Sequence, residues 1–199
     1  MLKGHVILAL LWILFGVLHS VLAALGMKQR FAKVFPQGLK YYRLLYTVFA
    51  FLTFGLVVWY QMLLPSPLLY VPHLFTTAVG GIVALVGLCI MVICIKKYFL
   101  SLSGLKSLFQ QRPTHQLMIS GIHRYVRHPL YLGTFLAIWG SFIIFPVLSL
   151  FISNFLITAY TLIGISFEEK KLITEFGTAY KTYQQTVPKL VPAFSRKPI

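Results

Sequence analysis

Two polar clusters in this mostly apolar chain contain residue types that could do chemistry. The first reads His-Arg-Tyr-Val-Arg-His-Pro-Leu-Tyr-Leu-Gly and runs from His123 to Gly133. The second is the pair Glu168-Glu169, which is conspicuous because the chain has only three acidic residues, all glutamate. Arginine and histidine can hold a carboxylate, and carboxylates can bind an ammonium group or sugar hydroxyls. If the clusters meet, they form a pocket suited to a zwitterionic or mixed-charge small molecule.

Each cluster also has a purely structural interpretation. Arginine and histidine often anchor a membrane span at the lipid headgroups, and Pro129 suits the first position of a helix. A glutamate pair beside Lys170 and Lys171 can be a solvated helix turn. That interpretation is weaker for Glu168-Glu169, because acid is scarce elsewhere and adjacent carboxylates repel each other.

The elements that position these clusters are predicted from the apolar runs. Of the 199 residues, 58% are hydrophobic and 11% charged, whereas soluble domains are about a quarter charged. Runs of about 20 apolar residues predict membrane spans at 5–26, 44–64 and 73–95. The stretch 129–167 has no formal charge and is predicted to form spans four and five, a helical hairpin with Pro146 near its turn. The fold class is therefore all-α, with five spans.

The basic residues predict the orientation of the chain in the membrane. Of the 18 Lys and Arg residues, only Lys3 lies outside three segments: the one after span one, the one after span three, and the C-terminal tail. The positive-inside rule then predicts the N-terminus outside and the C-terminus in the cytoplasm. Because topology explains the charge, we expect membrane lipids as partners and no nucleic acid.

The C-terminal tail is predicted to form an amphipathic helix that continues from span five along the membrane interface. Leu172, Phe176, Tyr180 and Tyr183 recur at intervals of four, four and three, and Val187-Pro188 should end the helix. The segments outside the membrane are too short to bury a core of their own. We expect a single membrane domain over 1–199, with three spans in 1–95 and the binding half in 96–199.

Several other kinds of site are not indicated. The chain has no glycine-rich nucleotide-binding motif. Its six histidines do not form closely spaced pairs, and with so few carboxylates they provide too few ligands for a metal. Cys89 and Cys94 are five residues apart, on different faces of a helix, so neither a disulfide nor a shared metal is expected.

Two segments carry a family resemblance. Residues 127–133, Arg-His-Pro-Leu-Tyr-Leu-Gly, with His115-Gln116-Leu117 and Gly121 before them, resemble the R-H-P-x-Y-x-G signature of isoprenylcysteine carboxyl methyltransferases. Phospholipid methyltransferases and bacterial relatives share this signature. The second segment, with Glu168-Glu169, Phe176-Gly177, Tyr180, Tyr183 and Val187-Pro188, is similar to the family's E-E…F-G-x-x-Y-x-x-Y…V-P ending.

The resemblance implies an integral-membrane methyltransferase that uses S-adenosylmethionine and takes a small-molecule or lipid acceptor from the bilayer. Such methyl transfer requires alignment of the reacting atoms and exclusion of water, and no metal. By the resemblance, the cofactor-binding residues would be His115, Gln116, Leu117, Gly121, Tyr125, Arg127, His128, Tyr131, Gly133, Glu168 and Glu169.

The acceptor is not determined by these residues, and a carboxylate, a thiol and an amine all stay open. Arg127 or Arg124 is our hypothesis for the group that orients an anionic acceptor. His19, followed by Ser20, is an ionisable residue inside a span, which indicates either a catalytic role or an interhelical hydrogen bond. The segment from Trp12 to Ser20 is similar to the start of bacterial relatives that methylate small thiols or have no assigned substrate, which favours an acceptor other than a prenylated protein.

Two alternatives compete with a methyltransferase. Membrane sterol reductases resemble this family in their C-terminal half and bind NADPH there, but they usually have more spans. A non-enzymatic scaffold or small transporter is the other alternative. Transporters typically have inverted repeats and helices broken at the midplane, and the sequence has neither pattern.

Overall fold

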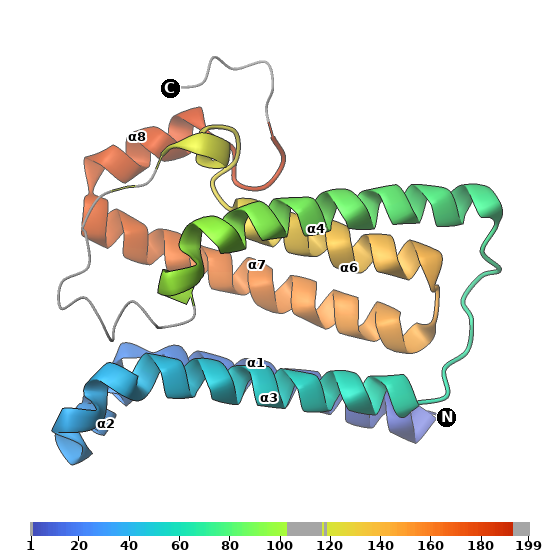
Figure 1. The fold of residues 1–199 in the computed structure, drawn as a ribbon, viewed down its shortest axis with the longest axis horizontal. Coiled ribbons are helices and arrows are strands. Elements are labelled where there is room, and N and C mark those ends of the chain that lie inside the picture. The colour runs from blue at the N-terminus through green and yellow to red at the C-terminus, as the bar shows by residue number, and fades with distance from the viewer. Residues whose placement is uncertain (1, 103–116, 118, 193–199) are drawn as a thin grey trace. The chain divides into compact units, whose positions relative to one another are not determined.

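A computed structural model of the chain describes residues 2–102, 117 and 119–192. In chain order its helices are α1 (Leu2–Ala23), α2 (Leu25–Val34), the 3₁₀ helix η1 (Pro36–Tyr41), α3 (Tyr42–Leu63), α4 (Leu74–Leu102), the 3₁₀ helix η2 (Gly121–Arg124), α6 (Pro129–Ile144), α7 (Leu148–Phe176) and α8 (Thr178–Thr186) (Figure 1). Over these residues the regular structure is entirely helical, which confirms the all-α prediction.

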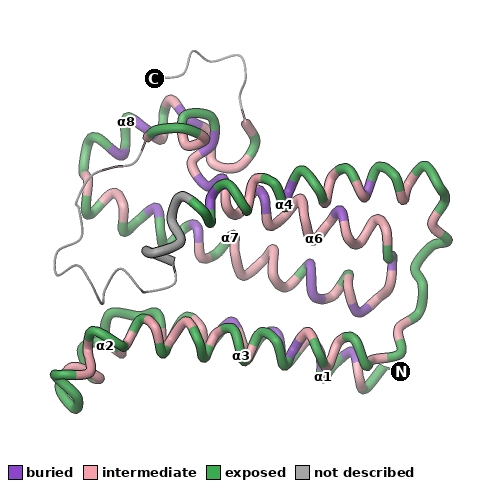
Figure 2. Tube along the Cα trace, in the orientation of Figure 1, coloured by how far each residue is buried: buried purple, intermediate pink, exposed green. Residues whose placement is uncertain are grey.

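Four helical segments are long and apolar enough to cross a membrane: Leu2–Ala23, Pro36–Leu63, Leu74–Lys96 and Leu148–Phe176. Few residues of α1 and α3 are buried (Figure 2), and many of their large apolar side chains are exposed. The chain is therefore an integral membrane protein. At 16 residues, α6 is about 24 Å long, shorter than the roughly 30 Å hydrocarbon core, so the predicted fifth span is not among the four.

The predicted C-terminal helix differs from the structure at one residue. The helix does continue from the membrane span, but α7 ends at Phe176 and α8 starts at Thr178. Gly177 between them has φ 57° and ψ −128°, a conformation that glycine adopts without the steric cost of a Cβ. The predicted end is confirmed, because α8 stops at Thr186, directly before Val187-Pro188.

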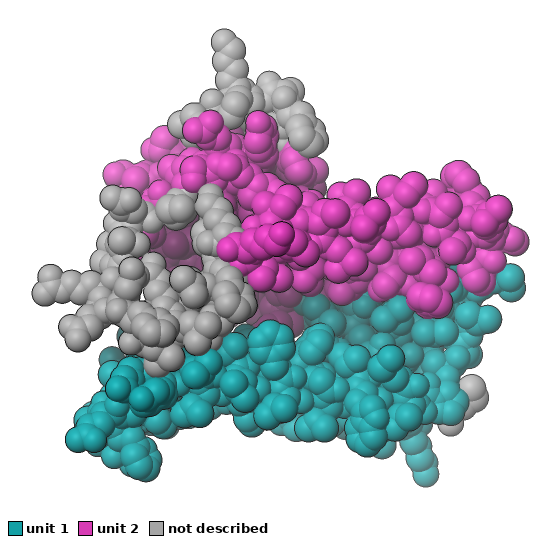
Figure 3. Space-filling model, viewed as in Figure 1, with its two compact units in different colours: residues 1–71, 97–113, 146–157 teal, residues 72–96, 114–145, 158–199 magenta. Residues whose placement is uncertain are grey.

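The chain divides into two compact units (Figure 3). Unit 1 comprises Met1–Val71, Lys97–Pro113 and Pro146–Ile157; unit 2 comprises Pro72–Lys96, Thr114–Phe145 and Thr158–Ile199. In unit 1, α1 packs along α3 around a core of Leu8, Trp12 and Val57. Two tyrosines of α3 donate hydrogen bonds to backbone carbonyls of α1, from Tyr60 to Gly4 (3.2 Å) and from Tyr42 to Leu22 (2.7 Å). The two helices are therefore antiparallel.

A set of polar contacts in unit 1 joins three parts of the chain that are distant in sequence. The Ser66 hydroxyl accepts a hydrogen bond from the Ser149 N–H (2.8 Å) and bonds the His5 ring (3.0 Å). The Leu69 N–H donates to the Pro146 carbonyl (2.7 Å). These bonds hold together the start of α1, the α3–α4 connection and the start of α7.

In unit 2, glycines bring α4 and α6 into backbone contact. A Cβ built on Gly87 would lie 2.6 Å from the carbonyl oxygen of Gly133, and one built on Gly80 would lie 2.9 Å from that of Gly140. Gly80 and Gly87 are seven residues apart in α4, and Gly133 and Gly140 are seven residues apart in α6, so each helix presents its two glycines on one face. Small residues at such positions allow membrane helices to approach closely. Of the four, only Gly133 was noted in the sequence, as a signature residue and not for packing.

This contact predicts that Gly87→Ala destabilises the protein while Gly81→Ala does not. The Gly87 methyl would press on the α6 backbone, at a cost of about 1–3 kcal/mol for overpacking. A Cβ on Gly81, in the same helix, meets nothing within 4 Å. The measurement is the midpoint of thermal unfolding in detergent. Equal midpoints for the two variants would contradict the close contact.

Candidate functional site

The two polar clusters come from elements that the local sequence positions. Pro129 begins α6 at its first position, where its fixed φ suits a helix and its missing N–H costs nothing. Arg127 and His128 therefore lie directly before that helix. The 29 residues of α7 extend about 43 Å, longer than a bilayer core of roughly 30 Å. Glu168 and Glu169 follow the first 20 residues of α7, where the helix has spanned about that thickness.

The closest charged contact in the site joins Arg127 to Glu169. Arg127 Nη2 lies 2.7 Å from Glu169 Oε1, and Arg127 Nε donates to the same oxygen at 2.9 Å. Only 8% of the arginine side chain and 10% of the glutamate side chain are exposed. A charge-assisted contact at these distances, shielded from water, is much stronger than a surface ion pair.

Two further groups surround the Glu169 carboxylate. The His128 Nε2 atom is 3.2 Å from Oε1, and Lys189 Nζ is 3.4 Å from Oε2. Both carboxylate oxygens therefore already have partners. Residues from three distant parts of the sequence meet at this one side chain.

Glu168 has a different environment from its neighbour. Its Oε2 accepts a hydrogen bond from the Tyr131 hydroxyl at 3.0 Å and lies 4.0 Å from His128 Nδ1. The Glu168 side chain is 44% exposed. The His128 and Tyr131 rings stack at 5.7 Å between centroids. His128 contacts Glu169 through one ring nitrogen and faces Glu168 with the other.

The segment after α8 docks on the Arg127-His128 backbone and on the arginine side chain. The N–H groups of Arg127 and His128 donate to the carbonyls of Pro188 (2.9 Å) and Lys189 (3.1 Å). Arg127 Nη1 donates to the carbonyls of Gln184 and Val187. Arg127 therefore uses its guanidinium to join α7 to the tail, with little of it left facing solvent.

A buried aromatic cluster supports this docking. Tyr180, Tyr183 and Val187 form its core, and Leu117 packs against it. The Tyr183 hydroxyl donates to the His123 carbonyl at 2.6 Å. The Tyr180 hydroxyl is fully buried and has no hydrogen-bond partner within the described part of the chain. Burial and the nearby Glu169 charge raise the Tyr180 pKa far above its ordinary value, so the phenol stays neutral and adds no charge to the site.

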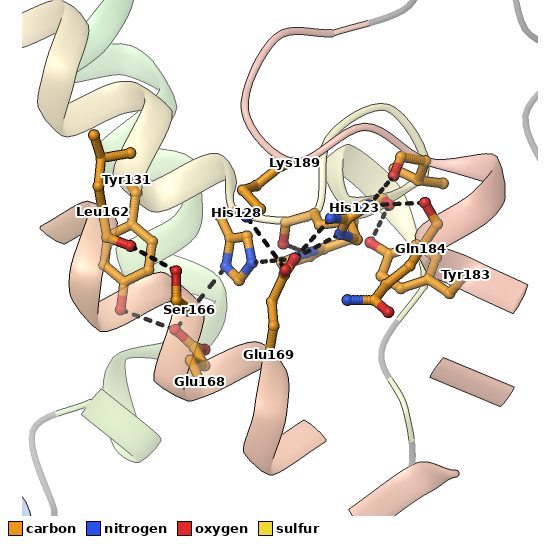
Figure 4. Close-up of polar contacts among 12 residues, drawn as sticks. His123, His128, Tyr131, Leu162, Ser166, Glu168, Glu169, Tyr183, Gln184 and Lys189 are labelled. Atoms are coloured by element: carbon orange, nitrogen blue, oxygen red, sulfur yellow. Dashed lines mark hydrogen bonds and ion pairs between the residues drawn. The ribbon is translucent and has the colours of Figure 1, made fainter. Parts of the chain in front are cut away.

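The structure brings five of the predicted site residues together: Arg127, His128, Tyr131, Glu168 and Glu169. Figure 4 labels the last four of them. Gly133 instead contacts Gly87 and Met91 of α4. Its place in the signature is thus explained by close helix packing.

The other predicted residues lie around or outside this group. Gly121 has φ 68° at the start of η2, and Arg124 and Tyr125 are exposed. His19 belongs to unit 1, where it hydrogen-bonds the Tyr46 hydroxyl of α3, as the interhelical alternative predicted. His115 and Gln116 lie outside the described residues.

Lys189 and the tail carbonyls were missed by the sequence analysis. The Val187-Pro188 step was used only as a helix end, although a cation follows it directly. With three acids in the chain, each cation near the motif was a candidate partner for one of them. For metals, no cluster of three or more His, Cys, Asp or Glu side chains that could hold an ion occurs in the described ranges.

Comparison with known proteins agrees with the geometry of this site. The model of the phospholipid methyltransferase family matches residues 75–179, a range that contains both polar clusters. The chain belongs to this family. Members of the family are methyltransferases, and the chain is accordingly a membrane transferase, as the resemblance to isoprenylcysteine carboxyl methyltransferases implied.

Individual relatives extend the similarity over most of the chain. Methanethiol S-methyltransferase 2 of Bradyrhizobium diazoefficiens is 34% identical and aligns with 94% of this chain and 73% of its own length. Methanethiol S-methyltransferase of Crocosphaera subtropica is 29% identical, covering 92% and 73%. Protein-S-isoprenylcysteine O-methyltransferase of Schizosaccharomyces pombe is 32% identical over only 39% of this chain and 34% of its own length. No solved structure matches.

The ion pair predicts that Arg127→Ala strongly destabilises this family member. Removing one partner of a buried pair leaves the Glu169 charge buried without its closest partner, at a cost of about 3–5 kcal/mol. Arg124→Ala, three residues away and exposed, should change the unfolding free energy by less than about 0.5 kcal/mol. Thermal unfolding of the two purified variants measures the difference. A small effect of Arg127→Ala would mean that the pair is not a main support of the site.

Proposed function

We propose that this chain transfers a methyl group from S-adenosylmethionine to a small alkyl thiol. The observation that carries the proposal is the open side of the polar cluster, formed by Glu168, Tyr131 and His128. A half-exposed carboxylate, a phenol and a ring nitrogen meet there, which suits a ligand with an ammonium group and sugar hydroxyls. S-adenosylmethionine would supply an electrophilic methyl group.

The residues of the chain bind and align in this proposal and perform no metal chemistry. Glu168 would hold the cationic amino group or the ribose hydroxyls, beside the Tyr131 hydroxyl and the His128 ring. A thiol acceptor reacts as its thiolate, and alignment with exclusion of water supplies the rest of the rate. Arg124 is our choice for steering an anionic acceptor, because the Arg127 side chain is occupied by Glu169 and the tail carbonyls.

The proposal of a small thiol as acceptor rests on which relatives cover the chain. Methanethiol S-methyltransferase 2 of Bradyrhizobium diazoefficiens and its namesake from Crocosphaera subtropica align with 94% and 92% of it, whereas the relative named for isoprenylcysteine aligns with 39%.

We further propose five spans, with α6 and α7 as the predicted hairpin. Two contacts support it: Tyr131 with Glu168, and Trp139 with Thr158 (3.1 Å). As residue numbers rise along α6 they fall along α7, as antiparallel helices require. The bonds among His5, Ser66 and Ser149 join the start of α1, the α3–α4 connection and the start of α7. Lys3 is the one lysine or arginine in these three parts, which by the positive-inside rule supports an outside N-terminus and a cytoplasmic C-terminus. The half from residue 96 would be the binding half of one membrane domain.

Two measurements on the purified protein test this function. Calorimetry should detect binding of S-adenosylhomocysteine, and NADPH should not compete with it. Incubation with S-adenosylmethionine and methanethiol should produce dimethyl sulfide, detected by gas chromatography. A farnesylcysteine analogue and phosphatidylethanolamine should accept little methyl.

Each failure has a distinct meaning. Binding of NADPH alone would favour the reductase alternative. Binding of S-adenosylhomocysteine without dimethyl sulfide formation would keep the methyltransferase and reject the acceptor.

A further inference from the structure

The two adjacent glutamates of the site differ in direction, in exposure and in the number of their polar partners. Successive residues of a helix point about 100° apart, so Glu168 and Glu169 leave α7 in different directions. Glu169 is buried, with four cationic or ring nitrogens on its two oxygens. Glu168 is 44% exposed at its side chain and has one hydrogen bond, to Tyr131. No hydrogen bond or ion pair to its second oxygen, Oε1, occurs within the described part of the chain.

Electrostatics assigns a cationic ligand to only one of these carboxylates. A ligand cation at Glu169 would lie next to the Arg127 and Lys189 charges, and like charges a few ångströms apart repel strongly away from bulk water. Glu168 has the Tyr131 hydroxyl and one nitrogen of His128 beside it, and within the described residues no lysine or arginine forms an ion pair with it. A positive amino group is therefore attracted to Glu168 without a competing charge in contact.

Glu169 has a structural role, because its partners come from two segments that are far apart in the sequence. Arg127 and His128 precede α6, and Lys189 follows α8. The same arginine holds the tail through the carbonyls of Gln184 and Val187. The Glu169 carboxylate thus fixes the side chain of Arg127, on which the tail docks. Lys189, which belongs to the tail, also contacts this carboxylate.

We propose that Glu168 is the ligand-binding carboxylate, whereas Glu169 and Lys189 are positioning residues that dock the Gln184–Lys189 tail segment on Arg127. This inference rests on the proposed function for the identity of the ligand, an adenosyl amino acid with a free ammonium group. The positioning role of Glu169 and Lys189 is independent of that identity. His128 lies between the two glutamates, with Nδ1 toward Glu168 and Nε2 toward Glu169.

The matched variants Glu168→Gln and Glu169→Gln test the proposal. Each removes one charge at neighbouring positions of the same helix. Glu168→Gln should leave the unfolding midpoint of the ligand-free protein unchanged and weaken S-adenosylhomocysteine binding by about tenfold or more, as expected for loss of a bond to a charged group. Glu169→Gln should lower the unfolding midpoint of the ligand-free protein. Two unchanged midpoints with equal losses of affinity would overturn the division of roles.

Lys189 provides a test that a general loss of stability would not mimic. Lys189→Gln should weaken S-adenosylhomocysteine binding, measured well below the unfolding midpoint, and Lys189→Arg should restore it. Lys181→Gln, the same charge change at an exposed position of α8, should leave the affinity unchanged. Because Lys189 acts through Glu169, adding Lys189→Gln to Glu169→Gln should cause no further loss.

The outcomes separate this proposal from the proposed function. If the wild-type protein does not bind S-adenosylhomocysteine, the function fails, and the unfolding midpoint of Glu169→Gln still shows whether Glu169 holds the tail. If wild-type binding is normal but Lys189→Gln and Lys181→Gln behave alike, the positioning role of Lys189 is wrong. Additive losses in the double variant would likewise reject its action through Glu169.

Discussion

The buried Glu169 carboxylate is the feature on which the binding half of this protein depends. A charge removed from water is tolerated only when paired and hydrogen-bonded, and Glu169 meets that requirement through Arg127, His128 and Lys189. Those partners come from the segment before α6 and from the segment directly after α8. Satisfying one carboxylate therefore fixes where three separate parts of the chain meet.

The constraint explains why the polar site can be built from so few charged residues. The arginine that neutralises Glu169 also donates to two tail carbonyls, so one side chain both pairs a charge and closes a loop. The neighbouring Glu168 is left half-exposed at its side chain. A ligand site and its support are thereby built from consecutive residues of one helix.

The helices around the site obey a second constraint, that of close backbone approach. Gly87 and Gly133 let α4 and α6 touch, and Gly177 ends α7 with a positive φ so that α8 can begin. Both Gly133 and Gly177 belong to motifs that carry the family resemblance. Their roles in the structure are steric, which separates them from Arg127, His128, Tyr131 and Glu168, whose roles are electrostatic or hydrogen-bonding.

The sequence by itself determined the all-helical membrane class and the family, because both depend on local patterns: apolar runs long enough to span a bilayer, and the R-H-P and E-E motifs. It also indicated that the scarce glutamates and the Arg127 segment belong to one site. Only the tertiary structure decided that Glu169 is buried and Glu168 is half-exposed, and that Lys189 pairs with Glu169. Adjacent residues of the same type are equivalent in a sequence, and their burial differs only through contacts with residues distant along the chain.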